Sequence, residues 1–119
     1  MKKINILKRG KEVLDIEADA IKDLKSRINN NFKLAVNLIL KTKGRTIVSG
    51  MGKTGIIAQK FSATLASTGT PSLFLHTAEA IHGDLGKVTA DDIVIILSNS
   101  GSTDEMKKLL PLLKKIGCK

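Results

Sequence analysis

Residues 45–55 read Arg-Thr-Ile-Val-Ser-Gly-Met-Gly-Lys-Thr-Gly, and this stretch decides the fold. Its first five residues are rich in β-branched side chains and are followed by a glycine, which is typical of a short buried strand. Apolar residues then recur at helical spacing from about Lys53 to Thr68, where Gly69-Thr70-Pro71 ends the pattern. A strand, a glycine turn and a helix in this order predict the start of a βαβ unit.

The segments downstream repeat the alternation. Residues 72–75 and 92–97 have the short apolar runs of buried parallel strands, residues 78–81 predict a helical turn, and residues 104–116 predict a last helix with a kink or local break at Pro111. Upstream, apolar residues at three- and four-residue steps from about Gly10 to Lys43 predict a helical hairpin that is broken at Asn29-Asn30-Asn31. The predicted fold class is therefore α/β, with an N-terminal helical hairpin before a parallel, doubly wound sheet.

The pattern divides the chain into a helical segment, residues 1–43, and a sheet-bearing domain, residues 44–119. Only three strands are predicted, and a parallel sheet needs helices on both faces and protected edges. We therefore expect residues 44–119 to be the front part of a larger domain, truncated after the third strand.

Composition and charge exclude several classes of protein. The chain has 119 residues, of which 42% are apolar, and its longest purely aliphatic run is far too short to cross a bilayer. No N-terminal signal peptide is recognisable and Cys118 is the single cysteine, so we expect a cytoplasmic protein without membrane association. The formal charge of +9 comes from lysines scattered along predicted helices, with three Phe and no Tyr or Trp, which argues against a nucleic-acid partner.

The first glycine loop matches two phosphate-binding motifs imperfectly. Gly50-Met-Gly-Lys-Thr-Gly55 follows the G-x-G-x-x-G pattern, but the next strand ends without the acidic residue that a dinucleotide site needs, and no cofactor is expected. A Walker A loop would require glycine where Ile47 stands. Two interpretations stay open: an anion site at a helix N-terminus, helped by Lys53 and Thr54, or a turn needed only for close strand–helix packing.

The second loop, Ser98-Asn-Ser-Gly-Ser-Thr103, lies between a predicted strand and a predicted helix N-terminus. It offers up to four hydroxyls and free backbone amides to one anion, although redundant capping of the helix is the competing explanation. Both loops follow strands of one parallel sheet, where ligands bind outside the carboxyl ends. We therefore expect them to face a single crevice.

Four motifs together resemble the sugar isomerase (SIS) domain, a flavodoxin-like fold, of the arabinose-5-phosphate isomerase family. They are residues 50–55, Ser67-Thr-Gly-Thr-Pro71, Glu79-Ala-Ile-His-Gly-Asp-Leu-Gly86 and Ser98-Asn-Ser-Gly101. The resemblance runs from about Lys11 to the last residue. It implies interconversion of ribulose 5-phosphate and arabinose 5-phosphate, an early step toward the octulosonate sugar of lipopolysaccharide, with a pentose 5-phosphate as ligand and a homo-oligomer, a tetramer in the family, as the assembled form.

The resemblance also implies roles for individual residues. The family's phosphate loop falls on Ser98, Asn99, Ser100 and Thr103, with Thr54 where the family usually has Ser, and the sequence departs from the family at Ser102, where Glu is common. The catalytic residues implied are Glu105 as the base at carbon, His82 as a proton shuttle between oxygens, and Lys53 as a stabiliser of the enediolate. His76 and His82 could approach a metal, but no carboxylate or thiol spacing supports a required one.

Three functional interpretations stay open at this point. The first is an enzyme-derived chain, a truncated or split isomerase whose missing part of the catalytic domain would lower its activity. The second is a non-catalytic sensor of sugar phosphates, although a regulator of that kind would carry a helix-turn-helix and the N-terminal segment shows none. The third is an inactive remnant of an interrupted gene.

Overall fold

The computed structural model describes residues 5–119, which divide into two compact units. One unit extends to Asn37 and the other runs from Leu38 to Lys119. In the described residues no helix is both long enough and apolar enough to cross a membrane.

The first unit is helical, as the apolar spacing predicted. Helix α1 (Ile6–Asp23) begins at Asn5, whose side chain accepts a hydrogen bond from the Lys8 amide at 3.1 Å, so the helix starts earlier than Gly10. A 3₁₀ turn, η1 (Leu24–Arg27), follows it and leads to α2 (Asn30–Lys41). The break falls at the predicted asparagines because Asn29 Oδ1 accepts the amide of Asn31 at 2.9 Å, which starts a new helix.

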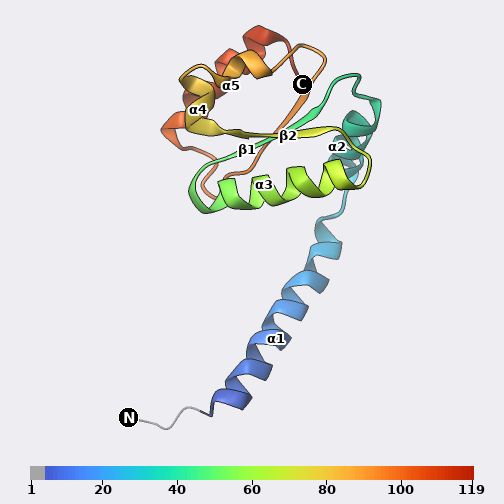
Figure 1. Ribbon diagram of the computed structural model, residues 1–119. Helices are drawn as coiled ribbons and strands as arrows, with labels where there is room; N and C mark the ends of the chain where they lie inside the picture. Colours follow the sequence, from blue (N-terminus) through green and yellow to red (C-terminus); the bar gives the residue numbers. More distant parts are fainter. Residues whose placement is uncertain (1–4) are drawn as a thin grey trace. The chain divides into compact units, whose positions relative to one another are not determined.

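The second unit is a parallel sheet with helices on both faces, which confirms the predicted fold class (Figure 1). Its strands are β1 (Thr46–Gly50), β2 (Ser72–His76) and β3 (Ile93–Ile96), in the spatial order β2-β1-β3. β1 pairs with both neighbours in parallel, with Ser49 opposite Leu75 and Ile96. The central strand is fully buried, as its continuous apolar and small side chains predicted.

Helix α3 (Gly52–Ser67) covers one face of the sheet and packs on β1 and β2. Its approach requires glycine at position 50, because a Cβ there would lie 2.8 Å from the Thr54 carbonyl oxygen. A Cβ at Gly55 would make a tight contact of 3.1 Å with the Gly50 carbonyl oxygen. The outer two glycines of residues 50–55 therefore serve strand–helix packing, as the simpler interpretation of this loop predicted.

Three helical segments follow on the other side: α4 (Thr77–Ile81), the 3₁₀ turn η2 (Asp84–Lys87) and α5 (Asp104–Ile116). Leu109 and Leu113 of α5 join Ile47 and Leu75 of the sheet in the main core. α5 has the predicted bounds, and it runs through Pro111 without ending there, so the expected local break is not found. Pro111 is exposed, where the hydrogen bond it cannot donate costs less than in a buried helix.

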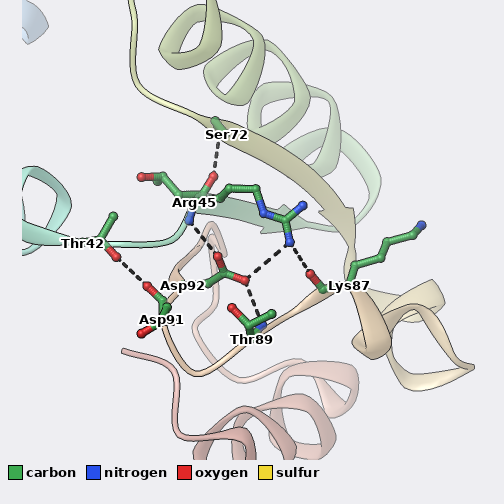
Figure 2. A network of polar contacts seen from close by, with 8 residues as sticks. Thr42, Arg45, Ser72, Lys87, Thr89, Asp91 and Asp92 are labelled. Atoms are coloured by element: carbon green, nitrogen blue, oxygen red, sulfur yellow. Dashed lines mark hydrogen bonds and ion pairs between the residues drawn. The ribbon is translucent and has the colours of Figure 1, made fainter.

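A buried carboxylate fixes the turn before β3 (Figure 2). Asp92 Oδ1 accepts a hydrogen bond from the Arg45 amide at 2.7 Å, and Oδ2 accepts one from the Thr89 amide at 2.8 Å. The Arg45 guanidinium lies 3.6 Å from Oδ2 and donates a hydrogen bond to the Lys87 carbonyl at 2.6 Å. The sequence predicted Asp92 as the first residue of the strand, but β3 begins one residue later, because the Asp92 side chain closes the turn. Position 44 must be glycine, because a Cβ there would lie 2.6 Å from the Asp91 carbonyl oxygen and 2.5 Å from Asp92 Oδ1.

Candidate functional site

The carboxyl ends of the three strands surround one cavity of about 390 Å³. The residues that line it come from the turn after β1, the start of α4 and the segment from the end of β3 to the first turn of α5. They are Met51, Lys53, Thr54, Thr77, Leu97, Ser98, Asn99, Ser100, Thr103 and Met106. The two loops singled out in the sequence therefore face one crevice, as expected for parallel strands that are neighbours in the sheet.

Glycine geometry sets up the turn after β1. Gly52 has φ +58°, a left-handed conformation that glycine adopts without strain, and α3 begins there. The Thr54 hydroxyl lines the cavity but donates its hydrogen to the Met51 carbonyl at 2.8 Å. Thr54 therefore caps its own helix. What the turn offers an anion is the set of first-turn amides of α3 and the exposed Lys53 ammonium.

The serine-rich loop after β3 is held by its own side chains. Ser98 Oγ accepts the Gly101 amide at 2.9 Å, Ser100 Oγ accepts the Ser102 amide at 3.4 Å, and Gly101 has φ +69°. Both hydroxyls act as acceptors in these bonds, which leaves their hydrogens free to be donated to a ligand.

The loop hydroxyls do not cap the helix that follows them. Thr103 is the N-cap residue of α5, and its side chain makes no capping hydrogen bond. In the described segment from Ser98 to Met106, no hydroxyl accepts a first-turn amide of α5. Redundant capping therefore does not explain the cluster, and the amides of α5 are available to an anion beside those of α3.

The structure brings together six of the eight residues that the sequence singled out, and two lie outside the lining. His82 is exposed at the C-terminal end of α4, where its amide bonds the Glu79 carbonyl at 3.1 Å. Glu105 is half-buried in the first turn of α5, next in sequence to Met106, which does line the cavity. The phosphate-binding and catalytic roles of all eight residues stay predictions.

Sequence reasoning missed the residues that form the rest of the lining. Met51, Leu97 and Met106 give the cavity apolar surface, and Thr77 adds a buried hydroxyl that lies 3.1 Å from the hydroxyl of Ser49. Thr77 could have been found, because it is the first hydroxyl after β2 at the same edge of the sheet. The two methionines carry no signal that distinguishes them from core residues.

No metal site is evident in the part of the chain that the structure describes, because residues 5–119 hold no cluster of three or more histidine, cysteine or acidic side chains that could bind an ion. The cavity instead combines hydroxyls, helix N-termini and one lysine, a set that suits a phosphate group on a small polar molecule.

The chain is similar in sequence to known proteins. Residues 38–119 match the SIS domain family. The chain is 50% identical over 114 residues to the arabinose 5-phosphate isomerase KdsD of Pseudomonas aeruginosa and 52% identical over 107 residues to that of Escherichia coli K12. These alignments cover 96% and 90% of this chain but only 35% and 33% of the relatives, so the chain spans about a third of their length.

A solved structure agrees over nearly all of the chain. The protein c3406 of E. coli CFT073, solved in complex with a phosphorylated sugar, superposes with a TM-score of 0.90 at 42% identity, covering 99% of this chain and 63% of that one. On the sequence match and this structural similarity, the chain belongs to the SIS domain family.

Proposed function

We propose that this chain forms the phosphate-binding part of a sugar-phosphate isomerase that interconverts ribulose 5-phosphate and arabinose 5-phosphate. The observation that carries the proposal is the cavity lined by both Thr54 and Ser100, with the N-termini of α3 and α5 beside it. Two helix N-termini and several hydroxyls at one point favour a doubly charged phosphoryl group. The relatives named arabinose 5-phosphate isomerase support the choice of sugar.

The proposed reaction moves one proton between neighbouring carbons. A base removes a proton from C1 of ribulose 5-phosphate, the 1,2-enediol forms, and the proton returns to C2 while the O1 hydroxyl loses its hydrogen and O2 gains one. We assign the carbon base to Glu105, the exchange between oxygens to His82, and stabilisation of the enediolate to Lys53. The product would feed lipopolysaccharide synthesis in the cytoplasm.

A binding-only function is the second candidate, and one observation favours it. His82 and Glu105 do not line the cavity, whereas the predicted phosphate-binding residues do. A chain with this arrangement could hold a pentose 5-phosphate as a sensor and turn it over slowly or not at all, since catalytic residues that act as a unit lose most of their effect when one is misplaced.

One pair of measurements on the purified chain separates the candidates. Ribulose 5-phosphate is supplied and arabinose 5-phosphate formation is followed, while calorimetry measures binding of the same sugar. Catalysis by Glu105 predicts that Glu105→Gln lowers turnover by about 10²–10⁴-fold with binding nearly unchanged. The matched control is Asp104→Asn, because Asp104 is exposed and pairs only with Lys107 at 3.7 Å in the described structure.

Each result points to one candidate. Turnover that survives Glu105→Gln would remove Glu105 as the base, and binding without turnover would favour the sensor. Absence of both binding and turnover would overturn the proposed function and leave the inactive remnant.

A further inference from the structure

Thr77 is the residue through which β2 contributes to the cavity. It follows the last residue of β2 and begins α4, and it lines the cavity beside the turns that follow the other two strands. Thr77 is only 1% exposed, so it forms part of the inner wall of the cavity. A hydroxyl at such a place needs a hydrogen-bond partner, and the direction of that bond decides what Thr77 can offer a ligand.

The partner of Thr77 is Ser49 of β1. Their hydroxyl oxygens lie 3.1 Å apart, and the geometry allows either one to donate the hydrogen that joins them. Within the described residues this is the hydrogen bond that each of the two side chains makes. One of the two hydroxyl hydrogens therefore has no acceptor in the described part of the protein.

Burial decides the direction of this bond. Ser49 is 0% exposed and does not line the cavity, so a spare hydrogen on it would stay unsatisfied, which is costly in a buried place. Thr77 lines the cavity, so a spare hydrogen on it can be donated to a ligand. The favoured arrangement is donation from Ser49 to Thr77. It fixes the Thr77 hydroxyl and leaves that residue with a hydrogen to donate.

The order of the strands indicates which part of a ligand this donor meets. In the proposed function the phosphoryl group lies between the first turns of α3 and α5, which follow β1 and β3. β2 lies on the other side of β1, and neighbouring strands are about 4.8 Å apart, so the ends of β2 and β3 are separated by about 10 Å. The cavity of about 390 Å³ also has the size of a small-molecule site, with room beyond a phosphoryl group. Thr77 is therefore placed to meet the sugar.

We propose that Thr77 is a specificity residue, whose hydroxyl is positioned by Ser49 and donates a hydrogen bond to an oxygen of the sugar chain. The proposal rests on the proposed function, because it takes the phosphoryl group as bound by the loops after β1 and β3. A buried donor of this kind selects by penalty as well as by attraction, since a ligand that lacks an oxygen at this point leaves the donor unpaired.

Calorimetric titration of the whole chain with arabinose 5-phosphate, and separately with inorganic phosphate, tests the role of Thr77. Thr77→Val removes the hydroxyl and should weaken arabinose 5-phosphate binding about three- to tenfold, the effect of one hydrogen bond, while phosphate binding stays within about twofold of wild type. Thr77→Ser keeps the hydroxyl and should bind both compounds nearly as wild type does. The matched control is Thr46→Val, which should also keep both affinities. Thr46 is 0% exposed and outside the lining, and its hydroxyl has no hydrogen-bond partner among the described residues.

The double variant Ser49→Ala/Thr77→Val tests whether Ser49 acts through Thr77. It should bind arabinose 5-phosphate as weakly as Thr77→Val does and no more weakly, whereas a separate contribution of Ser49 would add a further loss. The double variant removes both members of the pair and leaves neither hydroxyl unpaired. It therefore replaces Thr77→Val in the comparison if circular dichroism shows that the single variant is unfolded.

Three results would overturn the proposal while the proposed function stands. They are an unchanged affinity for arabinose 5-phosphate when the Thr77 hydroxyl is removed, an equal loss of affinity for both compounds, and a further loss in the double variant. Failure of the wild-type chain to bind either compound would overturn the proposed function, and this inference with it.

Discussion

Replacement of Asp92 by asparagine should lower the free energy of unfolding by about 1.5–3 kcal/mol, the range for one lost hydrogen bond to a charged group. The carboxylate accepts two backbone amides, at 2.7 and 2.8 Å, and an asparagine keeps an acceptor for one of them while setting its NH₂ group against the other. The Arg45 ion pair adds little to this figure, because the arginine side chain is 42% exposed and 3.6 Å away.

The same substitution should change how stability depends on pH. Burial of the Asp92 carboxyl raises its pKa, but hydrogen bonds from Arg45 and Thr89 and the charge of Arg45 outweigh burial and leave the pKa below its ordinary value of 3.8. A group with a lowered folded pKa stabilises the fold fully above its unfolded pKa and loses that contribution as pH falls through the folded value. The difference between wild type and Asp92→Asn should therefore be full above about pH 5 and shrink below 3.8.

Urea unfolding followed by circular dichroism, at pH 7 and at several values down to pH 3, measures both effects. Asp91→Asn is the matched control, because Asp91 is exposed and, among the described residues, only its backbone carbonyl is bonded, accepting Thr42 Oγ1 at 2.8 Å and the Gly44 amide at 3.0 Å. The reasoning fails if Asp92→Asn and Asp91→Asn are equally stable at pH 7, or if their difference is the same at pH 3.

Two further predictions concern packing and the cysteine. Gly50→Ala should lower the free energy of unfolding by about 1–3 kcal/mol, because its Cβ would lie 2.8 Å from the Thr54 carbonyl oxygen. Gly10→Ala, whose Cβ would lie in open space, should leave stability unchanged or raise it slightly, and equal melting temperatures of the two variants would contradict this. Burial raises the pKa of the Cys118 thiol, so at pH 8 iodoacetamide should alkylate Cys118 more slowly in the folded chain than in urea; an equal rate would show that the thiol is not held in the fold.

Sequence patterns predicted the strands and helices well because each has its own local signal. β1 and α3 follow from a β-branched run, glycines and helical spacing, and the new helix at Asn29 follows from asparagine's preference for caps. The turn before β3 was predicted poorly, because the role of Asp92 depends on Arg45, 47 residues away. Such a contact leaves no mark on neighbouring residues.

Part of the candidate site could likewise be predicted from the sequence, and part could not. Lys53, Thr54 and the hydroxyls of residues 98–103 could be placed together because loops after adjacent parallel strands share one edge of the sheet. The contributions of Met51 and Met106 depend on how α3 and α5 are rotated against the sheet, which no spacing reveals. The sequence also did not predict the hydrogen bond from the Thr54 hydroxyl to the Met51 carbonyl. Because that hydroxyl is engaged, backbone amides are the main groups of this turn that can bind an anion.

The central claim is that the loops after β1 and β3 bind one phosphate group together. Its most direct test is a two-dimensional amide NMR titration of the isotope-labelled chain with arabinose 5-phosphate, and separately with inorganic phosphate. The account predicts that amides at the start of α3, Lys53 and Thr54, and amides from Ser100 to Met106 shift together and give one dissociation constant for each ligand. Shifts confined to one of the two loops, or two different dissociation constants, would contradict it.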